Sequence, residues 1–290
     1  MGIFYIDVDN GENPDWQQPS GYPEGMVVTS WDTLFNSATG IITDGLESST
    51  VYILPRNDHE NPDISIRAID CGVIRNYANK EIKIIGIGYP KVYNSIACTI
   101  TIKTDNCEIT GLAVEHPNGN GIHTYADKSF IHHNKFVGDC SEGSDISIDE
   151  SNAIVEYNDI SPEIHGNRIG IIFYNAKNSI ARFNTIKNRR QFIFFYTNSE
   201  DCRSEKNTFL EQKSLEGYPW VVRFDSTAIR CKSIGDTIDG RNIDLSLGEA
   251  NPENGTDCEV LEKYAKGIKS SLPFIILGAG ILALLFLKNK

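Results

Sequence analysis

The sequence predicts an all-β solenoid whose short strands stack, coil upon coil, into parallel sheets. Stretches like NSIARFNTI (178–186) recur along the chain, and each carries an Asn, Asp or Gly near its end. A second kind of run, rich in Ile, Val and aromatic residues, falls between them, as in GIHTY (121–125), GIIFY (170–174) and FIFFY (192–196). Gly, Asn or Asp bound both kinds of run, which is typical of short strands joined by turns.

The Asn, Asp and Gly residues form a column with a nearly constant step. Its members are separated by 25, 23, 24, 26, 23 and 29 residues and are Gly86, Gly111, Asn134, Asn158, Asn184, Asn207 and Asp236. A unit of this length cannot bury its own apolar face, but stacked units share a continuous core. We therefore expect about seven to nine coils, with neighbouring strands about 4.8 Å apart.

This column predicts the turn of each coil. Asn, Asp and Gly tolerate left-handed backbone, and stacked Asn amides can hydrogen-bond to the coils above and below. The expected turn ladder consists of Asn134, Asn158, Asn184 and Asn207. In the stretch 178–186, Ile180 and Ile186 are expected to point into the core.

The N-terminal segment predicts a cap for the solenoid. In VTSWDTLFNSA (28–38), Trp31, Leu34 and Phe35 form one face of an amphipathic helix that would cover the first coil. Ser30 or Asp32 stands where a helix N-cap is expected. The run STVYILP (49–55) then predicts the first strand of the solenoid.

The N-x-I-x-x-x-N-x-I repeat, the opening FYIDVDNGENPDW (4–16) and the capping segment together resemble the pectate-lyase-like superfamily. The resemblance covers roughly residues 3–245. It implies a right-handed, single-stranded parallel β-helix with an N-terminal capping helix. It says little about activity, because this fold hosts lyases, hydrolases, epimerases, adhesins and phage spikes.

Catalytic motifs of that superfamily are missing from the sequence. Polygalacturonase-like hydrolases carry NTD, DD, GHG and RIK motifs, and none of these occurs here. The nearest approximation is an acidic stretch with its neighbours one coil on: Asp139, Glu142, Asp145, Asp149, Glu150 and Asp159, then Glu163, His165 and Arg168. If the chain is an enzyme, the acid–base candidates are Asp145, Asp149, Glu150 and Asp159. The same carboxylates could hold calcium, or they are solvated turn residues.

Aligning the second strand of each coil gives a column that contains Tyr125, Asp149, Tyr174 and Tyr196, with Phe224 or Asp225 next. The neighbouring column holds His123, Ser147, Ile172, Phe194 and Val222. If the tyrosines face outward, they form an aromatic ladder suited to stacking on sugar rings. The alternative is that they pack beneath a loop or against another subunit.

Other metal and cofactor signals are weak. His132 and His133 are adjacent, so on a strand they would face opposite sides and could not share one metal ion. The segment 7–11 (DVDNG) resembles part of a calcium loop but lacks its later acidic ligands, which favours a capped turn. The seven cysteines include no CxxC pair, so we expect buried free thiols. We expect no cofactor, with calcium as the one alternative.

The charge and the two ends of the chain constrain its partners. The formal net charge is −12, with 39 acidic and 27 basic residues, which argues against nucleic acid as a partner. The N-terminus has no signal-peptide pattern. Residues 272–287 are a continuous uncharged run, which predicts a membrane anchor. Its apolar side chains include Leu272, Phe274, Ile275, Leu277, Ile281, Leu284 and Leu287.

The sequence thus divides into four predicted parts: an N-terminal strand and capping segment (1–50), the β-helix (51–245), an acidic linker (246–267) and a transmembrane anchor (268–290). Our first hypothesis is a membrane-anchored structural protein. It would be a virion spike or a membrane-to-capsid connector that contacts other capsid proteins or itself, with a host-glycan recognition role. The alternatives are a membrane-tethered polysaccharide lyase or hydrolase, and a cell-surface adhesin.

Overall fold

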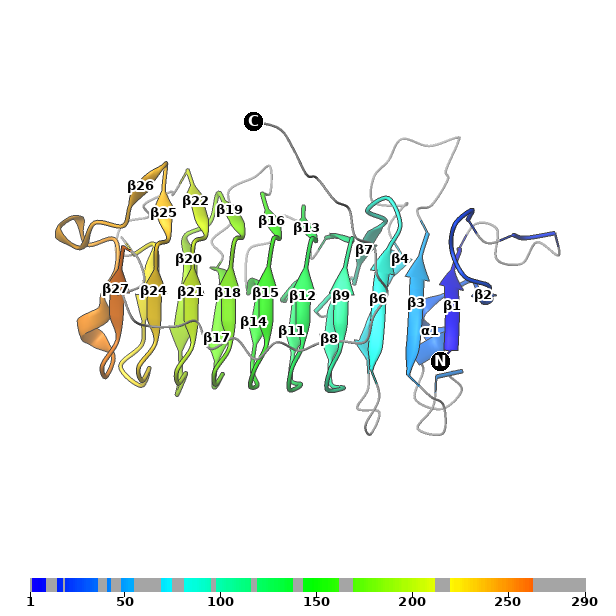
Figure 1. Cartoon of the computed structure of the whole chain (residues 1–290), viewed down its shortest axis with the longest axis horizontal. Coiled ribbons are helices and arrows are strands. Elements are labelled where there is room, and N and C mark those ends of the chain that lie inside the picture. Colours follow the sequence, from blue (N-terminus) through cyan, green and yellow to red (C-terminus); the bar gives the residue numbers. More distant parts are fainter. Residues whose placement is uncertain are drawn as a thin grey trace, which may run out of the picture.

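Stacked coils build a molecule that is mostly β, a parallel solenoid of about eight turns with little helix. Figure 1 shows the coils side by side along one axis, from β1 at the N-terminal end to β27 at the other. This computed structural model describes residues 2–8, 15–17, 19–35, 41–42, 48–54, 69–74, 81–94, 98–115, 119–137, 143–161, 169–211 and 220–262. The number of turns lies within the predicted range.

Three sheets form the walls of the solenoid. The first sheet runs in the order β2 (Met26–Val28), β1 (Gly2–Ile6), β3 (Ser49–Ile53), β6 (Ile82–Gly86), β9 (Glu108–Thr110), β12 (Phe130–His132), β15 (Ile154–Glu156), β18 (Ile180–Arg182), β21 (Arg203–Glu205), β24 (Lys232–Ile234) and β27 (Glu259–Leu261). The second runs β26 (Arg241–Asn242), β25 (Thr237–Ile238), β22 (Thr208–Leu210), β19 (Thr185–Lys187), β16 (Asp159–Ile160), β13 (Lys135–Phe136), β10 (Ala113–Val114), β7 (Lys91–Tyr93) and β4 (Ile69–Asp70). The third runs β23 (Val222–Phe224), β20 (Gln191–Tyr196), β17 (Ile169–Tyr174), β14 (Ser144–Ile148), β11 (Ile122–Thr124), β8 (Ile100–Ile102) and β5 (Val73–Ile74).

Each regular coil contributes one strand to every sheet, as β9, β10 and β11 do before β12 begins the next coil. Neighbouring strands pair in parallel, as β12 does with β9 and β15, whereas β25 and β26 are antiparallel. The parallel order follows from the repeat, because every coil runs in the same direction.

Apolar side chains from the three sheets meet inside the solenoid in columns along its axis. In the third sheet the rings of Phe173, Phe195 and Phe224 stack with centroids 4.9 Å apart. Ile186 lies in this core as predicted. Ile180 is also buried, at 5% exposed, but it lies outside the main core cluster because its neighbour Ala181 occupies the core position of β18.

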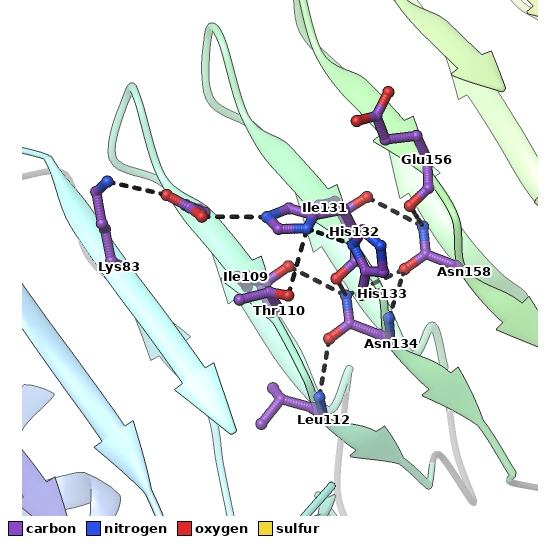
Figure 2. Close-up of polar contacts among 11 residues, drawn as sticks. Lys83, Ile109, Thr110, Leu112, Ile131, His132, His133, Asn134, Glu156 and Asn158 are labelled. Atoms are coloured by element: carbon purple, nitrogen blue, oxygen red, sulfur yellow. Dashed lines mark hydrogen bonds and ion pairs between the residues drawn. The ribbon is translucent and has the colours of Figure 1, made fainter. Parts of the chain in front are cut away.

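A ladder of buried amides follows the corner between the first and second sheets, at Asn134, Asn158, Asn184 and Asn207. The backbone N–H and the Nδ2 of Asn158 both donate to Asn184 Oδ1 at 3.0 Å, and its Nδ2 also donates to the carbonyl of Ile131. Figure 2 shows the first rungs, in which the Leu112 N–H donates to Asn134 Oδ1 and Asn134 donates to Asn158. Each amide thereby satisfies buried polar groups of two coils.

The prediction that the ladder residues adopt left-handed backbone is wrong. Positive φ belongs to the residue before each Asn: 52° at His133, 54° at Tyr157 and 56° at Phe183. Strand register aligns Thr110 with His132, so Gly111 belongs to this left-handed column and Leu112 stands at the Asn position. The two columns have separate tasks, because the amide must lie inside to reach the next coil while the left-handed residue makes the turn.

The first sheet continues beyond the predicted end of the solenoid at residue 245. Strand β27 pairs with β24, with Glu259 opposite Lys232, so part of the predicted linker (246–267) belongs to the solenoid. The segment CEVLE (258–262) repeats the register of CKSIG (231–235) but no Asn or Asp follows to mark it.

The N-terminal end is closed by helix α1 (Trp31–Phe35), which buries Trp31, Leu34 and Phe35 as predicted. Ser30 is its N-cap, because the Thr33 N–H donates to Ser30 Oγ at 3.2 Å, and Asp32 is exposed. No helix within the described residues is long and apolar enough to cross a membrane. The predicted anchor, with its apolar residues from Leu272 to Leu287, lies outside those residues.

Candidate functional site

The outer face of the third sheet carries the predicted aromatic column. Tyr174 pairs with Tyr196, and the adjoining pair Thr124–Ile148 aligns Tyr125 with Asp149. The residues that alternate with this column, such as Ile148 and Phe173, are fully buried, so the column points outward. Tyr125 is 45% exposed.

The neighbouring column ends differently from the prediction. Phe194 pairs with Arg223 rather than with Val222, which faces the core. The same register places Asp225, not Phe224, at the end of the tyrosine column. The Arg223 guanidinium lies over the Phe194 ring, 4.5 Å from its centroid. This register therefore places a cation at one end of an otherwise aromatic surface.

The two columns line a groove of about 690 Å³ that crosses β11, β14, β17 and β20 and reaches β23. Its walls are formed by Asn120, His123, Tyr125, Gly143, Ser144, Ser147, Asp149, Ile169, Ile172, Tyr174, Arg190, Gln191, Phe194, Tyr196 and Arg223. Its lining includes aromatic rings together with hydroxyl, amide and charged groups. This mixture of apolar surface with a few placed polar groups is typical of ligand sites.

A polar cluster lies at the β11 end of the groove. His123 Nε2 is 3.1 Å from Asp149 Oδ2, an ion-pair contact that lacks the alignment of a hydrogen bond. On its other side, His123 Nδ1 lies 3.9 Å from Cys98 Sγ and 3.3 Å from Asn120 Nδ2. Burial of the ring lowers the His123 pKa, but Asp149 and Cys98 outweigh it and raise the pKa to about 9.

Contacts within the same cluster also change the pKa of the Cys98 thiol. Burial raises its pKa, but the contacts with His123, the Asn120 backbone and Thr101 lower it below the ordinary value. In contrast, burial raises the pKa of Cys107 far above its usual range. Free thiols also occur at Cys71, Cys202 and Cys231, which are buried, and at Cys258, which is half-buried.

The acid–base candidates do not form one constellation. Asp145 is fully buried and pairs with Arg189, whose Nε and Nη2 lie 2.5 Å from its carboxylate oxygens. Asp149 faces the groove, Glu150 is exposed after β14, and Asp159 is exposed on β16 of the second sheet. Asp145 therefore cannot act on a substrate at the surface. The other predicted members, Asp139, Glu142, Glu163, His165 and Arg168, lie outside the described residues.

The two adjacent histidines lie together rather than apart. His132 ends β12 and His133 has positive φ, which turns its ring so that the two Nδ1 atoms are 2.8 Å apart. Figure 2 shows this pair and Lys83. The carboxylate of Glu108 is 3.1 Å from His132 Nε2 and also contacts Lys83. Across the described residues, no group of three or more His, Cys, Asp or Glu side chains could hold a metal ion. In the segment 7–11, Asp7 accepts from Trp16 Nε1, and residues 9–11 lie outside the described ranges.

A second exposed aromatic group, which we call the ridge, consists of His133, Tyr157 and Phe183. These rings stack in sequence with centroids 5.2 and 5.1 Å apart, and Tyr157 is 48% exposed. The ridge follows the left-handed column at an outer corner of the solenoid. None of its residues lines the groove.

Sequence reasoning missed Cys98, Asn120, Arg190, Gln191 and Arg223 as residues in or beside the groove. The coil period could not have identified Cys98, because the strand register pairs His123 with Thr101 and with Ser147. Comparison with protein-family models, curated proteins and solved structures finds no match for this chain. The solenoid architecture therefore stands without a family assignment.

Proposed function

We propose that this chain is a glycan-recognition protein whose solenoid is a scaffold and whose third sheet binds an oligosaccharide. The observation that carries the proposal is the groove, in which Tyr174, Tyr196 and Phe194 present rings on adjacent coils. Sugar rings offer apolar faces that pack on such aromatic surfaces. Their hydroxyl groups need hydrogen-bond partners close by, because binding removes them from water.

Polar groups stand where those hydroxyls would lie. Ser147 and Gln191 line the groove together with the aromatic rings, and Asn120 and Ser144 line its β11 and β14 side. The groove extends over several coils, which suits an oligosaccharide better than a single sugar.

Charge favours an acidic saccharide. The whole chain has a net charge of −12, yet the groove contains Arg190 and Arg223 at its β20 and β23 end. Guanidinium groups bind carboxylate and sulfate in a bidentate way, and their field attracts an acidic sugar to this end. Asp149, the acidic residue of the groove, lies at the opposite end next to His123.

The setting of this recognition protein follows from the C-terminal sequence. A tether at residues 272–287 would hold the solenoid at a lipid membrane, and the length of the solenoid suits a spike or connector on a membrane-containing virion. Co-purification with virus particles, together with protease accessibility of the solenoid, tests this setting. Fractionation with cell membranes alone would favour the adhesin alternative.

A glycan array that includes neutral, uronic and sulfated oligosaccharides tests the binding proposal. The full chain should bind the uronic and sulfated oligosaccharides of the array, and Tyr174→Ala or Arg223→Ala should abolish this binding. Tyr157→Ala on the ridge is the matched control and should bind as the unaltered chain does. Concentration-dependent self-association that Tyr174→Ala abolishes, without any glycan signal, would instead make this face an assembly surface.

A further inference from the structure

Three side chains from consecutive coils meet at the β11 end of the groove in the order thiol, imidazole, carboxylate. Cys98 precedes β8, His123 lies on β11 and Asp149 follows β14. His123 Nδ1 lies 3.9 Å from Cys98 Sγ, and Nε2 lies 3.1 Å from Asp149 Oδ2. In nucleophilic catalysis a base contacts the nucleophile, and a third group orients the base.

When His123 is neutral, the tautomer with the N–H on Nε2 suits Asp149, because a carboxylate only accepts hydrogen bonds. In that tautomer Nδ1 presents its lone pair toward the thiol and the Asn120 amide. The thiol proton can therefore pass from Cys98 to His123 Nδ1 and leave a thiolate beside an imidazolium.

We propose that Cys98 is a catalytic nucleophile, with His123 as its general base and acid, that removes acyl groups from O-acyl esters. Asp149 is a positioning residue in this assignment. The ester would be an O-acyl group on the saccharide in the groove, and this choice of alcohol rests on the proposed function. The thiol chemistry itself depends only on the three side chains and Asn120.

The reaction balances with an ester and water. The Cys98 thiolate attacks the carbonyl carbon and forms a C–S bond; the C–O bond to the sugar breaks, and the leaving alkoxide takes the proton from His123 Nδ1. Water then attacks the thioester and gives a proton to His123, and the C–S bond breaks. The products are the free sugar hydroxyl, a carboxylic acid and the regenerated thiolate–imidazolium pair.

Asn120 is placed to stabilise the oxyanion that forms during each attack. Its Oδ1 accepts hydrogen bonds from the Ser144 N–H at 2.8 Å and from Ser144 Oγ at 2.9 Å. With Oδ1 held by these bonds, Nδ2 lies 3.3 Å from His123 Nδ1. A donor fixed before the reaction is worth more than one that must reorient.

The contacts of Cys98 with its neighbours favour the thiolate. The groups that face the cluster are His123 on β11, Tyr125 directly after β11, Asp149 after β14, Tyr174 on β17, and Lys103 after β8, which lies 6.0 Å from the Tyr125 ring centroid. Burial raises the Tyr125 pKa, so the phenol is neutral near pH 7 and adds no charge against the thiolate. Cys98 is half-buried.

Limited alkylation of the full chain with iodoacetamide at pH 6, followed by peptide mass spectrometry, tests the activation of Cys98. Because only the thiolate reacts, Cys98 should react at least ~10-fold faster than half-buried Cys258. The contact with Cys231, together with burial, raises the pKa of Cys258. His123→Gln should slow Cys98, and Asp149→Asn should move its pH profile upward. Equal rates at Cys98 and Cys258 would overturn the assignment.

Acylation tests the catalytic step. p-Nitrophenyl acetate should release a burst of nitrophenolate and leave an acetyl group on Cys98. Cys98→Ser should lose both signals, and the matched Cys258→Ser should keep them, with circular dichroism verifying the fold of each variant. Absence of a burst from the unaltered chain, or acetylation that does not depend on Cys98, would refute the proposal.

Both assays use small reagents, so neither requires saccharide binding. A chain that binds no glycan can still show an activated Cys98. Conversely, a chain with an inert Cys98 can still bind glycans through Tyr174 and Arg223. The two proposals therefore fail separately.

Discussion

The Asn ladder and the groove occupy different faces of the same coils, and they use repetition in opposite ways. Along the ladder, the same amide recurs at Asn134, Asn158, Asn184 and Asn207, and each rung bonds to the next. Across the groove, equivalent positions on successive coils carry Tyr125, Asp149, Tyr174 and Tyr196, with no two adjacent coils alike until the last pair. Uniform positions satisfy the neighbouring coil, whereas the varied positions line the groove on the outer surface of the solenoid.

The groove nevertheless depends on the interior beneath it. The pair Asp145–Arg189 is fully buried. Ser144, which precedes Asp145, and Arg190, which follows Arg189, both line the groove. Gly170 lies on the coil between them, where a Cβ would come within 2.8 Å of Ile186 and the Phe192 carbonyl. A side chain at this position would therefore displace Ile186 or the backbone of β20.

The largest effect is expected from Asp145→Asn, which leaves the Arg189 charge buried without its partner. Breaking a buried pair in this way costs about 3–5 kcal/mol of unfolding free energy. Urea denaturation should measure the loss. The exposed carboxylate of Glu200, which pairs with Arg230, supplies the control: Glu200→Gln should leave the midpoint nearly unchanged. Equal midpoints for the two variants would contradict the structural role of Asp145.

The second largest loss of stability is expected from a substitution in the Asn ladder. Asn184→Ala removes the acceptor of the Asn158 N–H and the donor to the Val155 carbonyl, both buried. Leaving such groups unpaired costs roughly 2–4 kcal/mol in total. Asn242→Ala, on exposed β26, is the matched control and should cost little. If Asn184→Ala lowered the unfolding free energy no more than Asn242→Ala does, the ladder would not be holding the coils together.

Asp236 ends the ladder and should make stability depend on pH. Burial raises its pKa from 3.8 to about 6, against hydrogen bonds from Ser204, Ser233 and Asn207. The folded state then keeps a proton that the unfolded chain releases, so stability falls as pH rises from about 4 to 6. The change should be on the order of 2–3 kcal/mol and should vanish in Asp236→Asn. A pH profile that is the same with and without this substitution would contradict the assignment.

The smallest effect is expected at the ridge. Tyr157→Ala removes an exposed ring that stacks on His133 and Phe183, which should cost less than ~1 kcal/mol. Thermal unfolding should detect a shift of a few degrees at most. A loss as large as that of Asn184→Ala would place the ridge among the features that hold the coils together.

The architecture could be predicted because residues such as Asn158 and Asn184 recur once in each coil. Contacts that depend on backbone conformation could not be predicted. His132 and His133 meet because His133 is left-handed, which strand alternation cannot anticipate. Cys98 stands opposite Asn120 in the strand register, and its thiol reaches diagonally to His123. Such diagonal contacts follow from side-chain positions rather than from spacing.

The central claim is that the third-sheet groove, and not the repeated corner, meets the partner. Isothermal titration of the best-binding oligosaccharide from the array against the unaltered chain, Tyr174→Ala and Tyr157→Ala tests it most directly. The account predicts about a ten-fold weaker Kd for Tyr174→Ala, or about 1.4 kcal/mol, and no change for Tyr157→Ala. Loss of affinity in Tyr157→Ala with full binding by Tyr174→Ala would contradict it.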